Sequence, residues 1–274
     1  MPLQIIYFGS FQNYSVQVLE KLCKNFQLTA VVTTPPVPKG RHLHLVKNEV
    51  QIYSEKHNLA CYSLKTLEDI PSDIFSNPPD FIVVAGYGKL LPKLWLNLPK
   101  VMAVNFHPSL LPRYAGRCPA EWAILNGDKE TGVTLIRMTE KFDAGDILAR
   151  ETLSISPKDT RETLYQKLFD LGAETLIKTL PLIASGEIQP HSQPSDNNSS
   201  YARQITRQDG FIPWEEFQRQ LKTNDRQLET RLRALAGWPG VWTTDPTGKR
   251  LKLISLHPPL VQFEGKTPMP WRQS

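Results

Sequence analysis

Short apolar runs alternate with amphipathic stretches through the first half of the chain. Runs that are almost continuously apolar are typical of strands covered on both faces of a sheet. The segments between them place apolar residues at helical spacing, as Val16, Leu19 and Leu22 do. This order predicts an α/β fold with a doubly wound parallel sheet and right-handed crossovers. The predicted strands are Leu3–Phe8, Leu28–Thr33, Ala60–Tyr62, Phe81–Ala85 and Val101–Asn105, with a helix over Leu45–His57.

The pattern changes in the second half of the chain. Glu162–Ile183 is a long amphipathic segment, and Gly186 follows it. A polar, Pro- and Ser-rich stretch then separates it from the remainder, so we expect a catalytic domain over residues 1–188, a linker over 189–200 and a small β-containing domain over 201–274. Further predicted elements are a helix at Glu121–Asn126, a strand at Thr131–Met138, an opening helix of the small domain at Asn224–Leu235, and strands at Val241–Thr244 and Leu251–Leu256.

The charge of the chain is unevenly placed. Residues 201–274 hold 12 Lys and Arg against 7 Asp and Glu, whereas the first 200 residues balance to zero. A basic small domain indicates a polyanionic partner, although small surface domains also carry extra cations with no partner. Three cysteines without C-x-x-C spacing and the lack of an apolar run of membrane-spanning length predict a cytoplasmic protein with no membrane partner. We expect it to be a monomer.

The candidate chemistry lies in Val104–Gly116. Asn105 ends a predicted buried strand, and His107 follows two residues later. Ligands of open parallel sheets bind beyond the carboxyl ends of the strands, and residues two apart in an extended chain point to the same side. Asn105 and His107 are therefore expected to converge on one reacting atom, in a loop stiffened by Pro108 and Pro112.

A second loop supplies carboxylates. Asp143 and Asp146 flank Gly145, which permits a sharp turn. An amide, an imidazole and a carboxylate suit acyl transfer to an amine that is itself the nucleophile. Asn105 and His107 would donate hydrogen bonds to the oxyanion of the tetrahedral intermediate, and Asp143 would orient His107 and help move the proton.

Plainer interpretations exist for the same residues. Asn and His at strand ends often only stabilise a loop, and Asp143 and Asp146 could be turn residues. A metal site is not expected, because His42 and His44 lack a Cys or His partner at metal-ligand spacing. Residue chemistry alone leaves the catalytic and structural interpretations open.

Four motifs carry a family resemblance. The chain contains N-x-H-P-S-L-L-P-R-Y from Asn105, then A-I-x-x-G, T-G-V-T and D-x-G-D-I-L from Asp143. In this order and spacing they resemble the signature of the folate-dependent formyltransferases. The similarity runs from about Leu3 to Met269, and over that length it resembles the methionyl-tRNA formyltransferase family. Supporting segments are Gly9-Ser10, Thr34–Leu45, Val84–Pro92, Ile212–Trp214 and Gly237–Trp242.

The resemblance implies a Rossmann-like formyltransferase fold, 10-formyltetrahydrofolate as formyl donor and no metal. It implies that Asn105, His107 and Asp143 are catalytic. It also implies folate contacts and a basic loop that approaches a charged initiator tRNA. The implied folate-binding residues are Gly86, Tyr87, Gly88, Leu90, Ser109, Leu110, Leu111 and Pro112, and the implied tRNA-binding residues are Lys39, Arg41, His42 and Lys47.

Two departures from the family pattern concern the acceptor. Ala115 stands where the family usually has an arginine before Gly116, and Arg117 follows that glycine. The segment from Thr244 to Leu251 is also short, so the small domain is expected to be a reduced OB-like barrel. Both departures bear on acceptor recognition, not on formyl chemistry.

Several functions share these motifs. Formyl transfer to methionyl-tRNA is preferred because of the basic loop and the basic small domain. The alternative is an N-formyltransferase acting on a nucleotide-linked amino sugar. Glycinamide ribonucleotide formyltransferase fits less well because it lacks an added domain, and a formyltetrahydrofolate hydrolase needs only water as acceptor. From another class, an inactive tRNA- or folate-binding protein conflicts with the intact catalytic residues.

Overall fold

The computed structural model describes residues 2–39, 43–68, 71–194, 200–223 and 225–271. The chain forms two compact units, each assembled from separate segments. Unit 1 comprises Met1–Gly116, Gly132–Leu153 and Tyr165–Tyr201. Unit 2 comprises Arg117–Thr131, Ser154–Leu164 and Ala202–Ser274, so two of its segments lie in sequence between segments of unit 1. No helix in the described ranges is long and apolar enough to cross a membrane.

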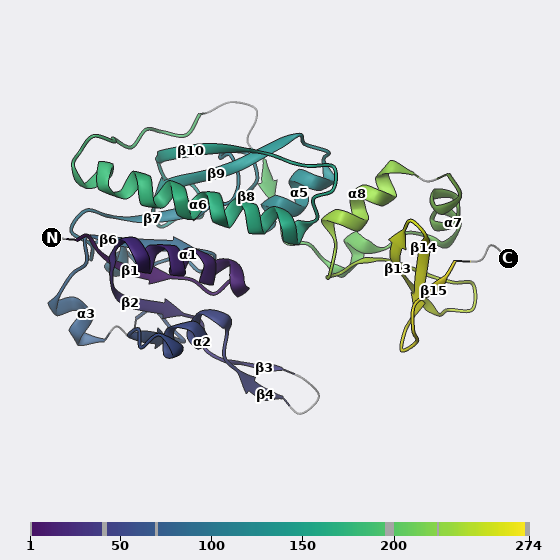
Figure 1. The fold of residues 1–274 in the computed structure, drawn as a ribbon, viewed down its shortest axis with the longest axis horizontal. Coiled ribbons are helices and arrows are strands. Elements are labelled where there is room, and N and C mark those ends of the chain that lie inside the picture. The colour runs from purple at the N-terminus through teal and green to yellow at the C-terminus, as the bar shows by residue number, and fades with distance from the viewer. Residues whose placement is uncertain (1, 40–42, 69–70, 195–199, 224, 272–274) are drawn as a thin grey trace. The chain divides into compact units, whose positions relative to one another are not determined.

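A seven-stranded sheet forms the centre of unit 1, in the order β10-β9-β7-β6-β1-β2-β5 (Figure 1). The neighbours from β7 to β5 all run parallel, which confirms the predicted doubly wound arrangement. The strand bounds are β1 (Gln4–Phe8), β2 (Gln27–Thr33), β5 (Cys61–Ser63), β6 (Phe81–Ala85), β7 (Met102–His107), β9 (Glu130–Arg137) and β10 (Ile147–Ser154).

Two parts of unit 1 differ from the sequence-based expectation. β9 pairs antiparallel with β7, so the sheet is mixed and not wholly parallel. The segment predicted as a helix from Leu45 begins instead with a strand, β4 (His44–Val46), which pairs with β3 (Val37–Lys39). Asn48 then caps the helix, because its side chain accepts a hydrogen bond from Gln51 N–H at 3.0 Å. The apolar residues before Asn48 belong to the hairpin and are exposed.

Helices cover both faces of the sheet in unit 1. α1 and α6 lie side by side on one face (Figure 1), joined by Lys21, whose ammonium group lies 2.6 Å from Asp170 and 3.2 Å from Glu174. Tyr7 points to this face and donates its hydroxyl hydrogen to Ser15 O at 2.7 Å. The helix bounds are α1 (Gln12–Asn25), α2 (Glu49–Lys56), α3 (Ser72–Ser76), α4 (Lys93–Leu96) and α6 (Arg161–Ala184), of which α6 belongs to unit 1 from Tyr165.

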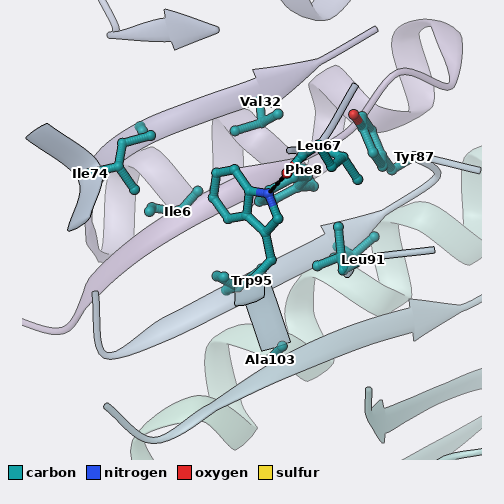
Figure 2. Close-up of a cluster of buried hydrophobic side chains, with 12 residues drawn as sticks. Ile6, Phe8, Val32, Leu67, Ile74, Tyr87, Leu91, Trp95 and Ala103 are labelled. Atoms are coloured by element: carbon teal, nitrogen blue, oxygen red, sulfur yellow. Dashed lines mark hydrogen bonds between the residues drawn. The ribbon is translucent and has the colours of Figure 1, made fainter. Parts of the chain in front are cut away.

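The opposite face buries an apolar cluster around Trp95 (Figure 2). The rings of Phe8 and Trp95 meet edge to face at 5.0 Å, and Trp95 N–H donates to the carbonyl of Leu67 at 2.8 Å. That hydrogen bond satisfies the polar edge of the largest fully buried side chain. Phe8 and its strand neighbour Tyr7 point to different faces, because successive residues alternate across a sheet.

Unit 2 contains a four-stranded antiparallel sheet with short helices around it. Its strands are paired in the order β12-β13-β14-β15. Within the described residues β12 and β15 are edge strands, so the OB-like closure expected from the resemblance stays an unconfirmed prediction. α7 precedes the helix that was expected to open the small domain. The bounds are α5 (Pro119–Leu125), α7 (Trp214–Thr223), α8 (Arg226–Ala234), β12 (Val241–Thr244), β13 (Arg250–Leu256), β14 (Pro259–Phe263) and β15 (Met269–Pro270).

A capped turn, η1 (Arg207–Gly210), lies near the start of the C-terminal segment of this unit. Thr206 and Asp209 form a capping box, in which Thr206 N–H donates to the carboxylate of Asp209 at 2.7 Å. Arg203 forms a bidentate ion pair with the same carboxylate. The hydrogen bonds from Arg203 and the nearby backbone hold the pKa of Asp209 far below its usual range. The turn that presents Arg207 is therefore held by a charged side chain at neutral pH.

Candidate active site

The alternation of β7 separates its polar and apolar side chains. Phe106 points towards α6, where its ring meets Phe169 edge to face at 4.9 Å and faces Gly172. Asn105 and His107 therefore point together to the other face of the sheet, as predicted. The strand continues through His107 instead of ending at Asn105, so both side chains are fixed by sheet pairing.

Asp143 joins these two side chains. Its Oδ1 accepts a hydrogen bond from Asn105 Nδ2 at 3.3 Å and lies 3.4 Å from His107 Nδ1. Its Oδ2 accepts from the backbone N–H of Gly116 at 2.9 Å. The side chains of His107 and Asp143 are 5% and 9% exposed, which limits how much water can weaken their interaction. Unit 1 thus brings all three predicted catalytic residues to the carboxyl end of β7.

Both ring nitrogens of His107 face acceptors. Nε2 lies 2.9 Å from the carbonyl oxygen of Tyr114, and Nδ1 faces the carboxylate of Asp143. A neutral imidazole has one N–H and can satisfy one of these acceptors, whereas the imidazolium form satisfies both. His107 can therefore donate a hydrogen bond to either of these two protein oxygens. Donation to a bound molecule requires that one of these two contacts open.

The loop that carries Asp143 has a strained backbone. Asp143 itself has φ +50°, in the left-handed region. A β-carbon at Gly145 would overlap the carbonyl oxygen of Arg137, so only glycine fits at that position. The side-chain amide of Gln193 donates to the carbonyl oxygens of Asp143 and Gly145 at 2.7 Å and 2.9 Å. These two hydrogen bonds hold the loop in its turn.

The backbone of the segment after His107 is held by hydrogen bonds to side chains of two other strands. Thr134 Oγ1 donates to the carbonyl of Ser109 at 2.7 Å and accepts from Leu111 N–H at 3.0 Å. Arg150 donates to the carbonyl of Leu111 at 3.1 Å. Ser109 and Leu111 are fully buried, and the peptide bond from Leu111 to Pro112 is cis. Of the predicted folate-binding residues in this segment, Leu110 and Pro112 are the partly exposed ones.

The predicted folate-binding residues after β6 divide in two. Tyr87 is buried, packs edge to face on Phe8 at 5.2 Å and lies in the apolar cluster of Figure 2. Burial raises the pKa of its hydroxyl to about 12. Gly86 lies against Phe11, whereas Gly88 and Leu90 are exposed. After β6, Gly88 and Leu90 are therefore accessible to a ligand, whereas Tyr87 is packed inside unit 1.

The predicted tRNA-binding residues are described only in part. Arg41 and His42 lie outside the described residues, and Lys39 ends β3. Lys47 is half exposed and forms an ion pair with Glu55 at 2.7 Å. An exposed pair of this kind contributes little to stability and can exchange its partner for a phosphate.

A model of one protein family matches most of unit 1. It is described as "Formyl transferase", and the match covers residues 3–180 of this chain.

The chain belongs to the formyl transferase family.

Relatives within this family are similar over almost the whole chain. The methionyl-tRNA formyltransferase of Geobacter metallireducens is 34% identical over 257 residues, which cover 93% of this chain and 79% of that protein. The methionyl-tRNA formyltransferase of Halalkalibacterium halodurans is 36% identical over 254 residues, covering 92% and 77%. The similarity therefore extends through unit 2 and is not confined to the catalytic motifs.

Solved structures of formyltransferases share the fold. A 4-N formyltransferase from Francisella tularensis superposes with a TM-score of 0.69 at 17% identity, covering 90% of this chain and 95% of that one. An N-formyltransferase from Helicobacter canadensis, in complex with folinic acid and dTDP-3-aminofucose, gives 0.63 at 18% identity, covering 93% and 88%. At this identity the likeness shows the shared fold alone.

The formyltransferase motifs do not identify every residue that shapes this site. Tyr114 lies inside one motif, but sequence gives no sign that its carbonyl faces His107. Ser200 accepts a hydrogen bond from Tyr114 N–H at 2.9 Å and holds that carbonyl in place. Gln193 and Ser200 both come from the polar segment interpreted as a linker. A polar, Pro- and Ser-rich composition is typical of a connecting segment whether or not its residues contact a site. No sequence pattern therefore distinguished Gln193 and Ser200 from their neighbours.

The described residues contain no cluster of three or more His, Cys, Asp or Glu side chains that could hold a metal ion. The polar groups around Asp143 are instead hydrogen-bond donors: the amide of Asn105, the ring of His107 and the N–H of Gly116. This arrangement suits the stabilisation of negative charge on an oxygen atom.

Proposed function

We propose that this protein transfers the formyl group of 10-formyltetrahydrofolate to the amino group of methionyl-tRNA. One observation carries the proposal: Asn105, His107 and Asp143 converge at the carboxyl end of β7 in a member of the formyl transferase family. The acceptor is supported by relatives named methionyl-tRNA formyltransferase that are 34–36% identical over 92–93% of the chain.

The side chains at the site fit a formyl donor. Asn105 has two amide hydrogens, and only one is directed at Asp143, so the second can bond to a formyl oxygen. Gly88 and Leu90 are exposed in the segment after β6, and Leu110 and Pro112 are partly exposed in the segment after β7. These four residues would border the folate, while the buried Tyr87 packs beneath the segment after β6.

The three catalytic residues would divide the work. Asn105 and His107 donate hydrogen bonds to the formyl oxygen as negative charge develops on it. Asp143 keeps both donors aligned and accepts a proton from the attacking amine as the new C–N bond forms. That proton then passes to the folate nitrogen as its bond to the formyl carbon breaks. His107 joins this step when its contact with the carbonyl of Tyr114 opens, because both ring nitrogens are otherwise engaged.

Recognition of the tRNA would involve cationic side chains outside this site. Lys47 can exchange Glu55 for a phosphate, and the basic loop of Lys39, Arg41 and His42 is expected to approach the acceptor arm. Contacts of this kind predict that affinity for tRNA falls as salt is raised. Ala115 and Arg117 mark where contacts at the acceptor end would differ from the family pattern.

The test combines purified protein, 10-formyltetrahydrofolate and charged initiator tRNA, and measures formyl-methionine after hydrolysis of the ester bond. We expect product only when all three are present. No product with tRNA, together with turnover of a nucleotide-linked amino sugar, would replace the proposed acceptor by the alternative. Release of formate without either acceptor would indicate a hydrolase.

A substitution separates the mechanism from the substrate. Asn105→Ala should lower turnover by roughly 100- to 1000-fold, the usual effect of removing one oxyanion donor. Asn97→Ala, at an exposed position after α4, is the matched control. Near-normal turnover in Asn105→Ala, with product still formed on tRNA, would exclude the proposed mechanism but not the proposed substrate.

A further inference from the structure

Unit 2 has a cavity of about 480 Å³ that the chemistry above does not use. It lies over the strands β13 and β14 and the turn that leads into β12. Cavities of roughly 300–1,000 Å³ hold small organic ligands. Its lining combines cationic, amide and aromatic side chains, and its principal members are Arg207, Trp238, Arg250, Lys252, Gln262 and Glu264.

The cavity carries excess positive charge. Arg207, Arg250 and Lys252 line it, and Glu264 is the one acidic side chain that the described residues contribute to the lining. Among the residues that the structure describes, none of these three cations forms an ion pair. Lys252 Nζ makes only a long contact, 3.4 Å, with the carbonyl oxygen of Gly237. Their charge is therefore available to an anion.

An indole holds the two guanidinium groups in place. The guanidinium carbon of Arg250 lies 4.6 Å from the ring centroid of Trp242, and that of Arg207 lies 5.5 Å from it. Trp242 N–H also donates to the carbonyl of Arg207 at 3.0 Å. Arg250 Nε is buried without a hydrogen-bond partner among the described residues. The two guanidinium groups thus lie over the same indole ring, and the hydrogen-bonding capacity of Arg250 is only partly used.

An exposed aromatic ring stands at the same cavity. Trp238 is 52% exposed, which is high for an indole. Its carbonyl accepts a hydrogen bond from Arg161 at 3.1 Å, and Pro239 follows it, so the backbone that carries the ring is fixed. A planar apolar surface beside several cations is suited to a ligand that joins a flat heterocycle to an anion.

We propose that this cavity binds one nucleotide. Its base would stack on Trp238, and its phosphate would lie between Arg207, Arg250 and Lys252. The nucleotide could be free or part of a single-stranded RNA segment, since both present the same base and phosphate. The site is separate from the catalytic residues and requires no formyl transfer, so it stands whether or not the proposed function holds.

Calorimetry on the full-length protein tests the proposal. The probes are adenosine 5′-monophosphate, adenosine, ribose 5-phosphate and a short single-stranded oligoadenylate. We expect the monophosphate or the oligonucleotide to bind, and adenosine and ribose 5-phosphate to bind more weakly because each lacks half of the recognised chemistry. Binding of the oligonucleotide without the monophosphate assigns the site to RNA, and the reverse assigns it to a free nucleotide.

Three variants locate the binding. Trp238→Ala should weaken it about tenfold or more, the usual effect of losing one base-stacking ring. Lys252→Ala should weaken it and reduce its salt dependence. Arg250→Ala should act in the same direction, but it also removes the contact with Trp242. Its circular dichroism must therefore match the wild type, and Lys252→Ala serves as the second test where it does not.

Two controls remove the same chemistry elsewhere. Arg219→Ala removes an exposed arginine from α7, and Phe75→Ala removes an exposed ring from α3; neither residue lines the cavity. Both should bind like the wild type. The proposal is overturned if neither nucleotide probe binds, or if folded Trp238→Ala and Lys252→Ala proteins bind as tightly as the controls.

Discussion

The end of β7 in unit 1 and the cavity of unit 2 use charge in opposite ways. Around Asp143, every named polar group has a protein partner: Asn105, His107 and Gly116 all direct a nitrogen at one carboxylate. In the cavity, Arg207, Arg250 and Lys252 gather without a carboxylate at ion-pair distance in the described residues. The proposed formyl transfer takes place where polar groups are already paired with one another. The proposed nucleotide site lies where cations have no anionic partner within the described part of the chain.

The difference reflects two physical requirements. A reacting atom gains most from donors that are already aligned, so a closed network that fixes their directions favours turnover. A binding surface gains from charge whose partner arrives with the ligand, because a pre-existing ion pair would have to be broken first. Four substitutions test this comparison, from the largest expected effect to the smallest.

The largest effect should come from opening the closed network. Asp143→Asn removes the negative charge that aligns Asn105 and His107 and that would accept the amine proton. Turnover should fall roughly 100- to 10,000-fold, the range for loss of a general acid–base group. The assay is formyl-methionine formation with charged initiator tRNA. Asp146→Asn, on the same loop, is the control and should keep near-normal turnover; equal losses in both variants would contradict a special role for Asp143.

The next largest effect should come from disturbing the packing of β7 against α6. Gly172→Ala would place a methyl group into the ring of Phe106, which lies between the two catalytic positions of β7. Overpacking of this kind costs about 1–3 kcal/mol, more than the roughly 0.5–1 kcal/mol that alanine gains over glycine in a helix. Denaturant unfolding should show the net loss, and turnover should fall with it. Lys178→Ala, on the exposed side of α6, should change neither quantity.

A smaller effect should follow from loosening the loop that carries Asp143. Gln193→Ala removes two hydrogen bonds to the carbonyls of Asp143 and Gly145, each worth about 0.5–1.5 kcal/mol. We expect kcat to fall about tenfold with little change in KM, because a misaligned carboxylate slows the chemistry more than binding.

Two related variants sharpen the test of Gln193. Gln193→Glu should not restore turnover, because a carboxylate cannot donate to a carbonyl. Gln189→Ala removes a similar amide that bonds to the carbonyl of Gly186 instead, and it should behave as wild type. A change in KM alone for Gln193→Ala would place this residue in substrate binding and not in positioning.

The smallest effect should come from the turn that presents Arg207 to the cavity. Asp209→Ala removes its capping box and should lower the free energy of unfolding by about 1 kcal/mol at pH 7. Since Arg203 lowers the pKa of Asp209 in the folded state, this stabilisation is present above the ordinary aspartate pKa and is lost as the pH falls below it.

Unfolding curves at several pH values check this sign. The difference between wild type and Asp209→Ala should shrink as the solution is acidified. Glu216→Ala, which removes an exposed carboxylate paired with Arg219, should show a smaller difference at pH 7. A difference that grows on acidification would contradict the assigned role of Asp209.

Strong periodicity made part of the fold predictable. The predicted strands Phe81–Ala85 and Val241–Thr244 match β6 and β12, and the helix predicted at Glu162–Ile183 extends by one residue at each end as α6. Each of these segments has an apolar pattern that fits one kind of element. β10 was missed because half of its residues face solvent, and α7 because its interior face includes the polar Gln220.

The residues of the candidate site were likewise only partly predictable from the sequence. The convergence of Asn105 and His107 follows from the alternation of an extended chain, so spacing alone predicted it. Residue chemistry offered Asp143 as the partner of His107 but left a turn role open, because nothing in the sequence says which loop approaches β7. The resemblance to a family favoured the catalytic role. The role of Gln193 could not be predicted from the sequence. Its hydrogen-bond partner Asp143 is 50 residues away, and its own segment has the composition of a linker.

The opposite directions of Phe106 and its two neighbours make this enzyme's chemistry sensitive to chain length. If evolution deleted or inserted one residue within β7, a phenyl ring would face the substrate and the amide and imidazole would be pressed against α6. Changes in length are therefore tolerable only in the connections outside the strand. We therefore expect acceptor choice in such proteins to change through the loops and through unit 2, while the number of residues in this one strand stays constant.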